Sequence, residues 1–162
     1  MQKRESLYNS SLGLELAIRP LVSEDLPRML DIEHQGHSHP WAEGVFLDCF
    51  KPSYRLWGAC LDDALVGYAV ATYILDEVHL LNLCVHPDAR GHGVGKCLLR
   101  HLVAEALCES MNQVLLEVRQ SNSVACKLYR KEGFEEIGRR PQYYPASSGR
   151  EDARIMSLLI QP

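Results

Sequence analysis

Residues 90–99 read RGHGVGKCLL, and this stretch decides the fold of the chain. An apolar, strand-like run, LLNLCV at 80–85, precedes it, and a helical pattern over 97–107 follows. Glycines at the alternate positions 91, 93 and 95 leave the backbone without Cβ atoms, so successive N–H groups can close around an anion. The positive end of the following helix dipole points to the same place, where a phosphate group is the natural ligand. The sequence therefore predicts a strand, a phosphate-binding loop and a helix in succession.

Two common phosphate-binding motifs do not fit this loop. A dinucleotide fingerprint requires Gly-x-Gly-x-x-Gly, and its third glycine is replaced by Lys96 in one register and by a leucine in the other. A nucleoside-triphosphate loop requires a glycine and a hydroxyl residue at the positions of Arg90 and Cys97. What remains is Arg-x-x-Gly-x-Gly, formed by Arg90, Gly93 and Gly95, or a glycine-rich turn that binds no ligand.

Composition and charge restrict the class of protein. The chain has 162 residues and is 46% hydrophobic, enough for one domain with a full core, which we expect over 14–162 after a loose lead-in over 1–13. The formal net charge is −4 and basic runs are short, which argues against nucleic acid as the main partner. No apolar stretch approaches the roughly 20 residues of a membrane span, and the N-terminus is polar. We therefore expect a cytoplasmic protein with no membrane partner; the sequence leaves the oligomeric state open, with a monomer favoured.

The cysteines and histidines do not form a recognisable metal motif. The six cysteines lack Cys-x-x-Cys spacing and lie mostly in apolar segments, which predicts reduced, buried thiols. His34, His37 and His39 are close in sequence, but their spacing is not a usual zinc pattern and Cys49 is remote. We therefore predict no metal.

The remaining elements alternate between strands and helices. Asp62-Asp63 is the predicted turn of a hairpin, and Gly133 is the predicted end of the last helix. Strands are expected at 14–18, 54–60, 65–74, 77–85, 113–118, 134–138 and 152–159, and helices at 23–34, 42–49, 97–107 and from 123. This order predicts an α/β fold, a mixed sheet with helices on both faces.

Two side chains suggest acid–base chemistry. Glu117 lies in a strand among apolar neighbours, where a carboxylate is either part of a structural ion pair or a base facing a cleft. Tyr129 lies in the last full turn of a helix, where it either packs in the core or donates a proton. The residues alone leave both alternatives open.

The loop formed by Arg90, Gly93 and Gly95 resembles that of the GNAT superfamily of N-acetyltransferases. Other segments are similar to the bacterial ribosomal-protein-alanine N-acetyltransferases: LEVRQSN at 116–122, PWAE at 40–43, YYP at 143–145 and GREDA at 149–153. The resemblance extends over about residues 15–160 and implies a GNAT-like fold, with a mixed, mostly antiparallel central sheet.

The resemblance also implies an activity. It implies transfer of an acetyl group from acetyl-coenzyme A (acetyl-CoA) to the N-terminal alanine of a small-subunit ribosomal protein, the eighteenth, with Glu117 as general base and Tyr129 as general acid. The residues expected to bind the coenzyme are Leu83, Cys84, Val85, Arg90, Gly91, His92, Gly93, Val94, Gly95, Lys96 and Asn122. The residues expected to bind the peptide are Trp41, Glu43, Tyr143 and Tyr144, the two tyrosines on a loop between the last two strands.

Three alternatives to parts of this interpretation remain. The tyrosine pair at 143–144 is also compatible with ordinary packing in an edge hairpin. A broader acetyltransferase acting on lysine side chains or small amines would carry the same loop. A non-catalytic acyl-CoA-binding protein of the same fold is the third, although a base, an acid and a phosphate-binding loop together argue against it.

Overall fold

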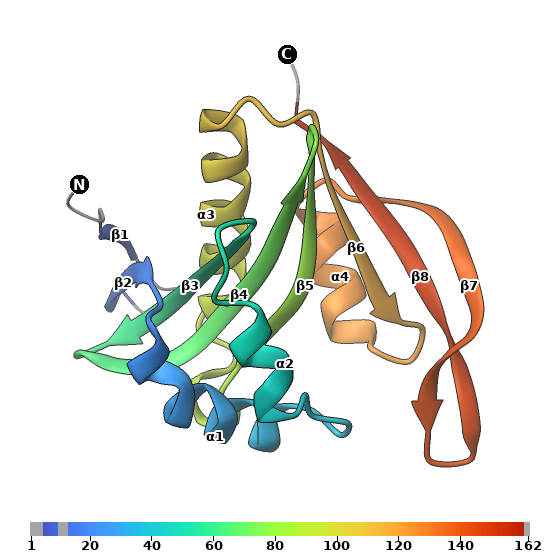
Figure 1. The fold of residues 1–162 in the computed structure, drawn as a ribbon, viewed down its shortest axis with the longest axis horizontal. Coiled ribbons are helices and arrows are strands. Elements are labelled where there is room, and N and C mark those ends of the chain that lie inside the picture. Colours follow the sequence, from blue (N-terminus) through green and yellow to red (C-terminus); the bar gives the residue numbers. More distant parts are fainter. Residues whose placement is uncertain (1–4, 10–12, 161–162) are drawn as a thin grey trace.

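A computed structural model describes residues 5–9 and 13–160, which form one eight-stranded sheet in the order β1-β2-β3-β4-β5-β6-β8-β7 (Figure 1). The strands are β1 (Ser6–Asn9), β2 (Glu15–Pro20), β3 (Tyr54–Leu61), β4 (Ala64–Ile74), β5 (Glu77–Val85), β6 (Gln113–Arg119), β7 (Glu135–Ala146) and β8 (Gly149–Leu159). Neighbouring strands are antiparallel except β5 and β6, which are parallel. The prediction of a mixed, mostly antiparallel sheet is confirmed.

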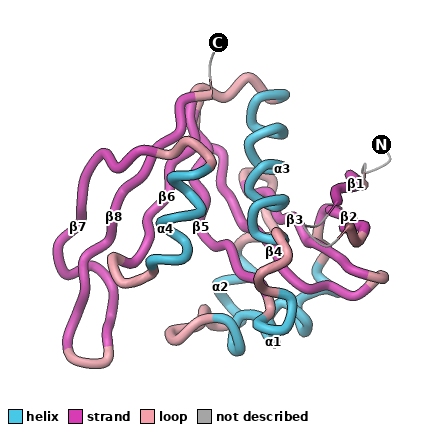
Figure 2. Tube along the Cα trace, turned by 180° about the vertical axis from the view of Figure 1, so that it is seen from behind, coloured by secondary structure: helices cyan, strands magenta, loops and turns pink. Residues whose placement is uncertain are grey.

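Helices cover both faces of this sheet, as predicted. Figure 1 shows α1 and α2 in front of the sheet, and the reverse view of Figure 2 shows α3 and α4 on the other side. The helices are α1 (Leu26–Gly36), α2 (Glu43–Asp48), α3 (Val94–Cys108) and α4 (Ser123–Lys131), with 3-10 turns at Ser23–Asp25 and Pro87–Ala89. None of the helices within 5–9 and 13–160 is both long and apolar enough to cross a membrane.

The sheet separates two hydrophobic cores. Alternate residues of a strand point to opposite faces, so Tyr68 of β4 packs with Met29 and Phe46 of α1 and α2, while its neighbour Ala69 packs with Leu98 of α3. The α3/α4 core also holds Tyr129 and the buried side chains of β6. Each helix layer therefore depends on its own set of buried residues on the shared sheet.

Two differences from the expected boundaries concern the lead-in and the start of α3. Within the lead-in that we expected to be loose, Ser6–Asn9 forms edge strand β1, paired with β2 and joined to α3 by a hydrogen bond between Tyr8 Oη and His101 Nδ1 (3.0 Å). Residues 1–4 and 10–12 of the lead-in lie outside the described residues. Helix α3 begins at Val94 rather than at Cys97, because Gly93 adopts the left-handed conformation (φ 80°) that starts the helix.

The tyrosine pair lies on a strand, which corrects the expectation of a loop. Strand β7 continues to Ala146, and only residues 147–148 turn into β8. The register shifts between Arg140 and Tyr144, where Gln142 has a positive φ of 48°. An irregularity of this kind accommodates Pro141 within the strand and lets the pairing resume beyond it.

Truncation of a core leucine of α3 is expected to destabilise the fold. Leu98→Ala leaves a cavity in the α3/α4 core, where the side chain is fully buried, and should lower the free energy of unfolding by about 2–5 kcal/mol. Leu107→Ala, at a 54% exposed position of the same helix, is the matched control and should change it by less than about 1 kcal/mol. Denaturant unfolding of both variants measures the difference; equal effects would contradict this description of the core.

Candidate active site

An opening between β5 and β6 is the main feature of the site. The two strands pair only over Glu77–Leu80 and Gln113–Leu116, and they then diverge (Figure 1). On the other side of β5, Val70 opposes Asn82 and Ala71 opposes Leu80, so Leu81 is an extra residue, a β-bulge. A bulge bends the strand that carries it, and this one lies where the pairing with β6 ends.

The bulge also exchanges the two faces of β5. Val78 and Leu80, before it, belong to the α3/α4 core, whereas Cys84, beyond it, belongs to the α1/α2 core. Leu83 and Val85 accordingly pack toward α3 and α4. The bulge therefore changes which side of the sheet each later residue of β5 can reach.

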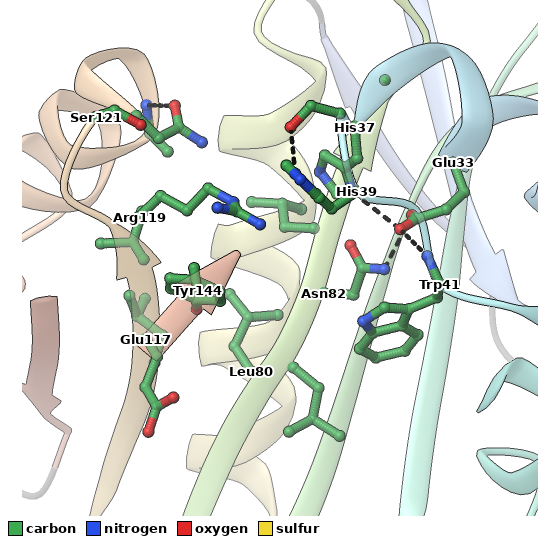
Figure 3. A pocket seen from close by; sticks show the side chains of 18 of the residues that line it. Glu33, His37, His39, Trp41, Leu80, Asn82, Glu117, Arg119, Ser121 and Tyr144 are labelled. Carbon is green, nitrogen blue, oxygen red and sulfur yellow. Dashed lines mark hydrogen bonds and ion pairs between the residues drawn. The ribbon is translucent and has the colours of Figure 1, made fainter. Parts of the chain in front are cut away.

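A groove with a volume of about 550 Å³ lies in the opening. Figure 3 shows Glu33, Trp41 and Asn82 on one side of it, and Arg119 and Ser121 on the other. The groove is lined by Glu33, Gly36, His37, Ser38, His39, Trp41, Leu80, Leu81, Asn82, Leu83, Leu116, Glu117, Val118, Arg119, Ser121, Asn122, Ala125, Tyr129, Tyr144 and Pro145. Its walls therefore come from both faces of the sheet.

Glu117 and Tyr129 both line this groove but lie on opposite faces of the sheet. Leu116 and Val118 of β6 are buried in the α3/α4 core together with Tyr129, so Glu117 between them points to the α1/α2 face. Burial raises the pKa of Tyr129 above its ordinary value, with smaller contributions from Cys126 and Tyr144, which keeps its hydroxyl protonated as a hydrogen-bond donor. Through the opening, a molecule on one face can meet a molecule on the other.

The phosphate-binding loop lies at the far end of β5. The first helical hydrogen bond of α3 runs from Cys97 N to Gly93 O (3.0 Å), so the N–H groups of residues 94–96 have no acceptor within the helix. A Cβ built on Gly95 would lie 3.7 Å from Val85 Cγ2 and 3.6 Å from Leu128 Cδ2, which places the loop against both β5 and α4. These N–H groups and the helix dipole make an anion site next to the groove.

Arg90 has a different environment from the one its motif suggested. Its guanidinium donates to the carbonyl oxygens of Gly36 (3.0 Å) and Val85 (3.3 Å), and so joins the end of α1 to the end of β5. Within the described chain, the buried Nδ1 of His92 has no hydrogen-bond partner. Asn122 begins α4, and its Oδ1 accepts from Ala125 N (3.1 Å).

The buried carboxylate of Glu33 was not predicted. It accepts hydrogen bonds from His37 Nδ1 (3.0 Å), Trp41 N (3.1 Å), Asn82 Nδ2 (3.0 Å) and Tyr68 Oη. Burial alone would raise its pKa, but the hydrogen bond and charge of His37, with further bonds from Tyr68 and Trp41, hold the pKa of Glu33 below its ordinary value. Glu33 thereby fixes the segment that carries Trp41 against the groove.

The β7–β8 hairpin supplies the opposite wall. Arg119 donates to Glu151 (3.0 Å) and to the carbonyl of Pro145, and its guanidinium lies 4.5 Å from the centre of the Tyr144 ring. Burial, together with the charge of Glu117 and the nearby Tyr143, raises the pKa of Tyr144 to about 12. The contacts of Arg119 with the Tyr144 ring and with the carbonyl of Pro145 hold this ring in the groove wall.

Glu117 is also an ion-pair partner. Its Oε1 lies 2.8 Å from Nε of Arg140 on β7, and its charge raises the pKa of the neighbouring Tyr143. Its side chain is 27% exposed, so a groove-facing carboxylate and a structural ion pair are combined in one residue.

The structure brings some of the predicted residues together and separates others. Those lining the groove are Trp41, Leu83, Glu117, Asn122, Tyr129 and Tyr144. Tyr143 is 42% exposed and, like Glu43 at the start of α2, is not among the residues that line it. Cys84 is buried toward α1, so only its backbone can face the coenzyme side. The roles of all these residues stay predictions.

Comparison with known proteins decides the family. The Acetyltransferase (GNAT) family model matches residues 17–134. This chain belongs to the GNAT family. The predicted family resemblance and enzyme class are thereby confirmed.

Two relatives from bacteria illustrate the similarity. The [ribosomal protein bS18]-alanine N-acetyltransferases of Salmonella typhimurium and Escherichia coli K12 are 39% and 38% identical to this chain. The alignments span 86% and 88% of this chain, and 95% and 97% of theirs.

Solved structures show the same fold. The crystal structure of the ribosomal-protein-S18-alanine N-acetyltransferase from Escherichia coli superposes with a TM-score of 0.88 at 37% identity, covering 91% of this chain and 95% of that one. A putative acetyltransferase from Salmonella typhimurium, yncA, solved with its cofactor acetyl-CoA, has a TM-score of 0.76 at 20% identity and shares the fold; the match covers 90% of this chain and 94% of that one.

The Glu33–His37 pair predicts a pH-dependent stability. Burial alone would lower the pKa of His37, but Cys84 and Glu33 raise it from 6.5 to about 10. A group with a raised folded pKa stabilises the fold fully below pH 6.5, and that stabilisation is lost as the pH rises to about 10. The difference in melting temperature between the wild type and His37→Gln should therefore shrink over this range.

The control for this measurement is His34→Gln, on the exposed side of α1. Thermal unfolding of the three proteins at a series of pH values, with a metal chelator present, gives the comparison. A wild-type minus His37→Gln difference that is constant with pH would contradict the assigned ion pair.

Proposed function

We propose that this chain transfers the acetyl group of acetyl-CoA to the α-amine of an N-terminal alanine on a ribosomal protein, the protein bS18 named in its relatives. The single observation that carries the proposal is the opening between β5 and β6, which has Glu117 on one face and Tyr129 on the other. A cytoplasmic site of action follows from this substrate.

The residues present fit acetyl-CoA. The N–H groups of 94–96 at the start of α3 suit the pyrophosphate, and Gly91, with φ 79°, and Gly93 keep the loop open around it. The edge of β5 beyond Leu80 does not pair with β6, so the backbone of Leu83, Cys84 and Val85 can hydrogen-bond the amide groups of the coenzyme arm. The coenzyme supplies an activated thioester when it is bound.

The chain's own residues supply the proton transfers. An α-amine has a pKa of about 8, so roughly a tenth is neutral at pH 7, which makes a carboxylate, acting directly or through a water, an adequate base. Glu117 is the carboxylate on the α1/α2 face of the opening, where Trp41 and Tyr144 form the peptide-binding walls. Tyr129, on the opposite face, donates a hydrogen bond to the departing sulfur and, as general acid, gives it a proton, while the proton lost by the amine goes to Glu117.

Aromatic side chains stand at the peptide end of the groove. We assign peptide contacts to Trp41, whose ring packs on Phe46 (5.3 Å between ring centres), and to Tyr144 on the opposite wall. Glu43 and Tyr143 lie outside the groove lining and, in this proposal, contact residues of the peptide beyond the first. In this proposal the aromatic side chains on the two walls favour a small first residue such as alanine.

Substitution of the two proton-transfer residues is expected to slow catalysis. Glu117→Gln and Tyr129→Phe should each lower kcat by about 10²–10⁴-fold, because each removes one general acid or base. Steady-state rates with an alanine-first peptide, and thermal melts to confirm folding, measure this.

Matched controls separate chemistry from stability. Glu135→Gln changes an exposed carboxylate at the start of β7, and Tyr73→Phe removes a buried hydroxyl that has no partner among the described residues; both should keep the wild-type kcat. Wild-type turnover in Glu117→Gln and Tyr129→Phe would overturn the assignment.

Two peptides distinguish the substrate classes. One begins with a free alanine followed by a basic tail, and the other has a blocked N-terminus and free lysines. Acetylation only of the free alanine, located by fragmentation mass spectrometry, is the expected result. Acetylated lysines would identify a broader acetyltransferase, and coenzyme binding without transfer to any amine would identify a non-catalytic binder.

A further inference from the structure

Three potential metal ligands from two separate segments meet on the α1/α2 side of the groove. They are Glu33 near the end of α1, His37 just beyond it and Cys84 on β5, and one ligand atom of each lies within 4.8 Å of the other two. It is the one group of this kind within 5–9 and 13–160. The sequence prediction of no metal did not consider this combination, because it compared only nearby histidines and cysteines.

The fold builds this cluster by two local features. The bulge at Leu81 turns Cys84 toward α1, where its thiol donates to Ile32 O (3.6 Å). Gly36 ends α1 directly above the sulfur, and a Cβ at that position would lie 2.4 Å from Cys84 Sγ. The missing side chain therefore lets Cys84 and His37 come together.

The donor set identifies the class of metal ion. Carboxylate oxygen, imidazole nitrogen and thiolate sulfur are ligands of Zn²⁺, whereas Mg²⁺ and Ca²⁺ require oxygen ligands. Zinc sites with three protein ligands keep a fourth position for water. Glu33 and His37 line the groove and Cys84 lies behind them, so a fourth position faces the groove.

A buried, unpartnered acceptor stands beside the cluster. Asn82 is 6% exposed, and its Nδ2 donates to Glu33 Oε2 (Figure 3), while its Oδ1 has no hydrogen-bond partner within the described part of the chain. Buried acceptors are normally satisfied, so this one needs a donor. A water held by a metal ion would supply it. We propose that Glu33, His37 and Cys84 form a Zn²⁺ site whose open position faces the groove.

Binding of Zn²⁺ leaves the net charge of the three-residue cluster unchanged. Zn²⁺ replaces the proton of the His37 imidazolium and the proton of the Cys84 thiol, and Glu33 is already ionised, so two protons leave for each ion bound. Tyr68 keeps its proton because burial raises its pKa. The cluster is therefore neutral before and after binding.

Occupancy would change the peptide side of the groove. Glu33 holds the backbone of Trp41, and His37 belongs to the same wall, so an ion bound to both residues fixes this wall against the entering peptide. We expect slower acetyl transfer, a consequence that rests on the proposed function. The binding test below contains no coenzyme or peptide and is independent of it.

The experiment uses the full chain, reduced and freed of metal by a chelator. Zn²⁺ is titrated in competition with a chelating dye, and released protons are counted in weakly buffered solution. Co²⁺ then replaces Zn²⁺ as a spectroscopic probe. The expected results are one ion per chain, about two protons released, and a thiolate-to-cobalt charge-transfer band.

Variants locate the site. Cys84→Ser and His37→Gln should each weaken Zn²⁺ binding at least about 100-fold, and Cys84→Ser should abolish the cobalt–thiolate band. Cys108→Ser removes the exposed thiol, and His34→Gln removes a neighbouring exposed histidine; both should bind like the wild type. His37, with a 35% exposed side chain, gives a test that does not depend on replacing a buried residue.

Three outcomes would overturn the proposal. They are absence of the thiolate band in the wild type, unchanged affinity in His37→Gln, and loss of binding in Cys108→Ser, which would identify the exposed thiol as an adventitious ligand.

Discussion

One β-bulge determines most of what this molecule can do. A regular β5 would continue to pair with β6 beyond Leu80, and the sheet would be closed. The extra residue at Leu81 bends β5 away from β6. It also shifts the alternation of side chains by one residue, so the later residues of β5 point to the opposite faces. Three features follow from this one-residue bulge: the opening, the unpaired edge of β5 that faces it, and the approach of Cys84 to α1. Because Glu117 and Tyr129 lie on opposite faces, only such an opening lets them act on the same pair of reactants.

The second constraint is electrostatic. A carboxylate buried as completely as that of Glu33 is costly unless hydrogen bonds compensate it, and four donors converge on this one. Three of those donors belong to residues that line the groove: His37, Trp41 and Asn82. These three residues are therefore fixed in the groove wall, because moving any of them would remove a hydrogen-bond donor from the buried carboxylate. The wall formed by the β7–β8 hairpin uses the same principle around Arg119 and Glu151.

How far the sequence predicts this structure depends on how local each signal is. The glycine loop and the Asp62-Asp63 turn were predictable because each needs particular residues at fixed positions. The bulge was not, since Leu80, Leu81 and residues 83–85 are all apolar, and such a run is equally compatible with a regular buried strand. The position of Glu33 could have been recognised from the sequence. It lies seven residues after Leu26, on the core face of α1, where a charged residue indicates a structural or functional role. Which donors would surround it depends on tertiary contacts between α1, β4 and β5, which no sequence window contains.

The unpaired edge of β5 also bears on aggregation. An open strand edge normally invites a strand of another chain, and proteins blunt such edges with charges, prolines or short lengths. Here the edge is recessed: it lies inside the sheet, between two strands that remain joined at one end, and Trp41 and Tyr144 stand on either side. A slender extended molecule can enter and use the backbone groups, whereas a second sheet cannot approach. The interior position of the opening is thus a form of protection against aggregation as well as a place for chemistry.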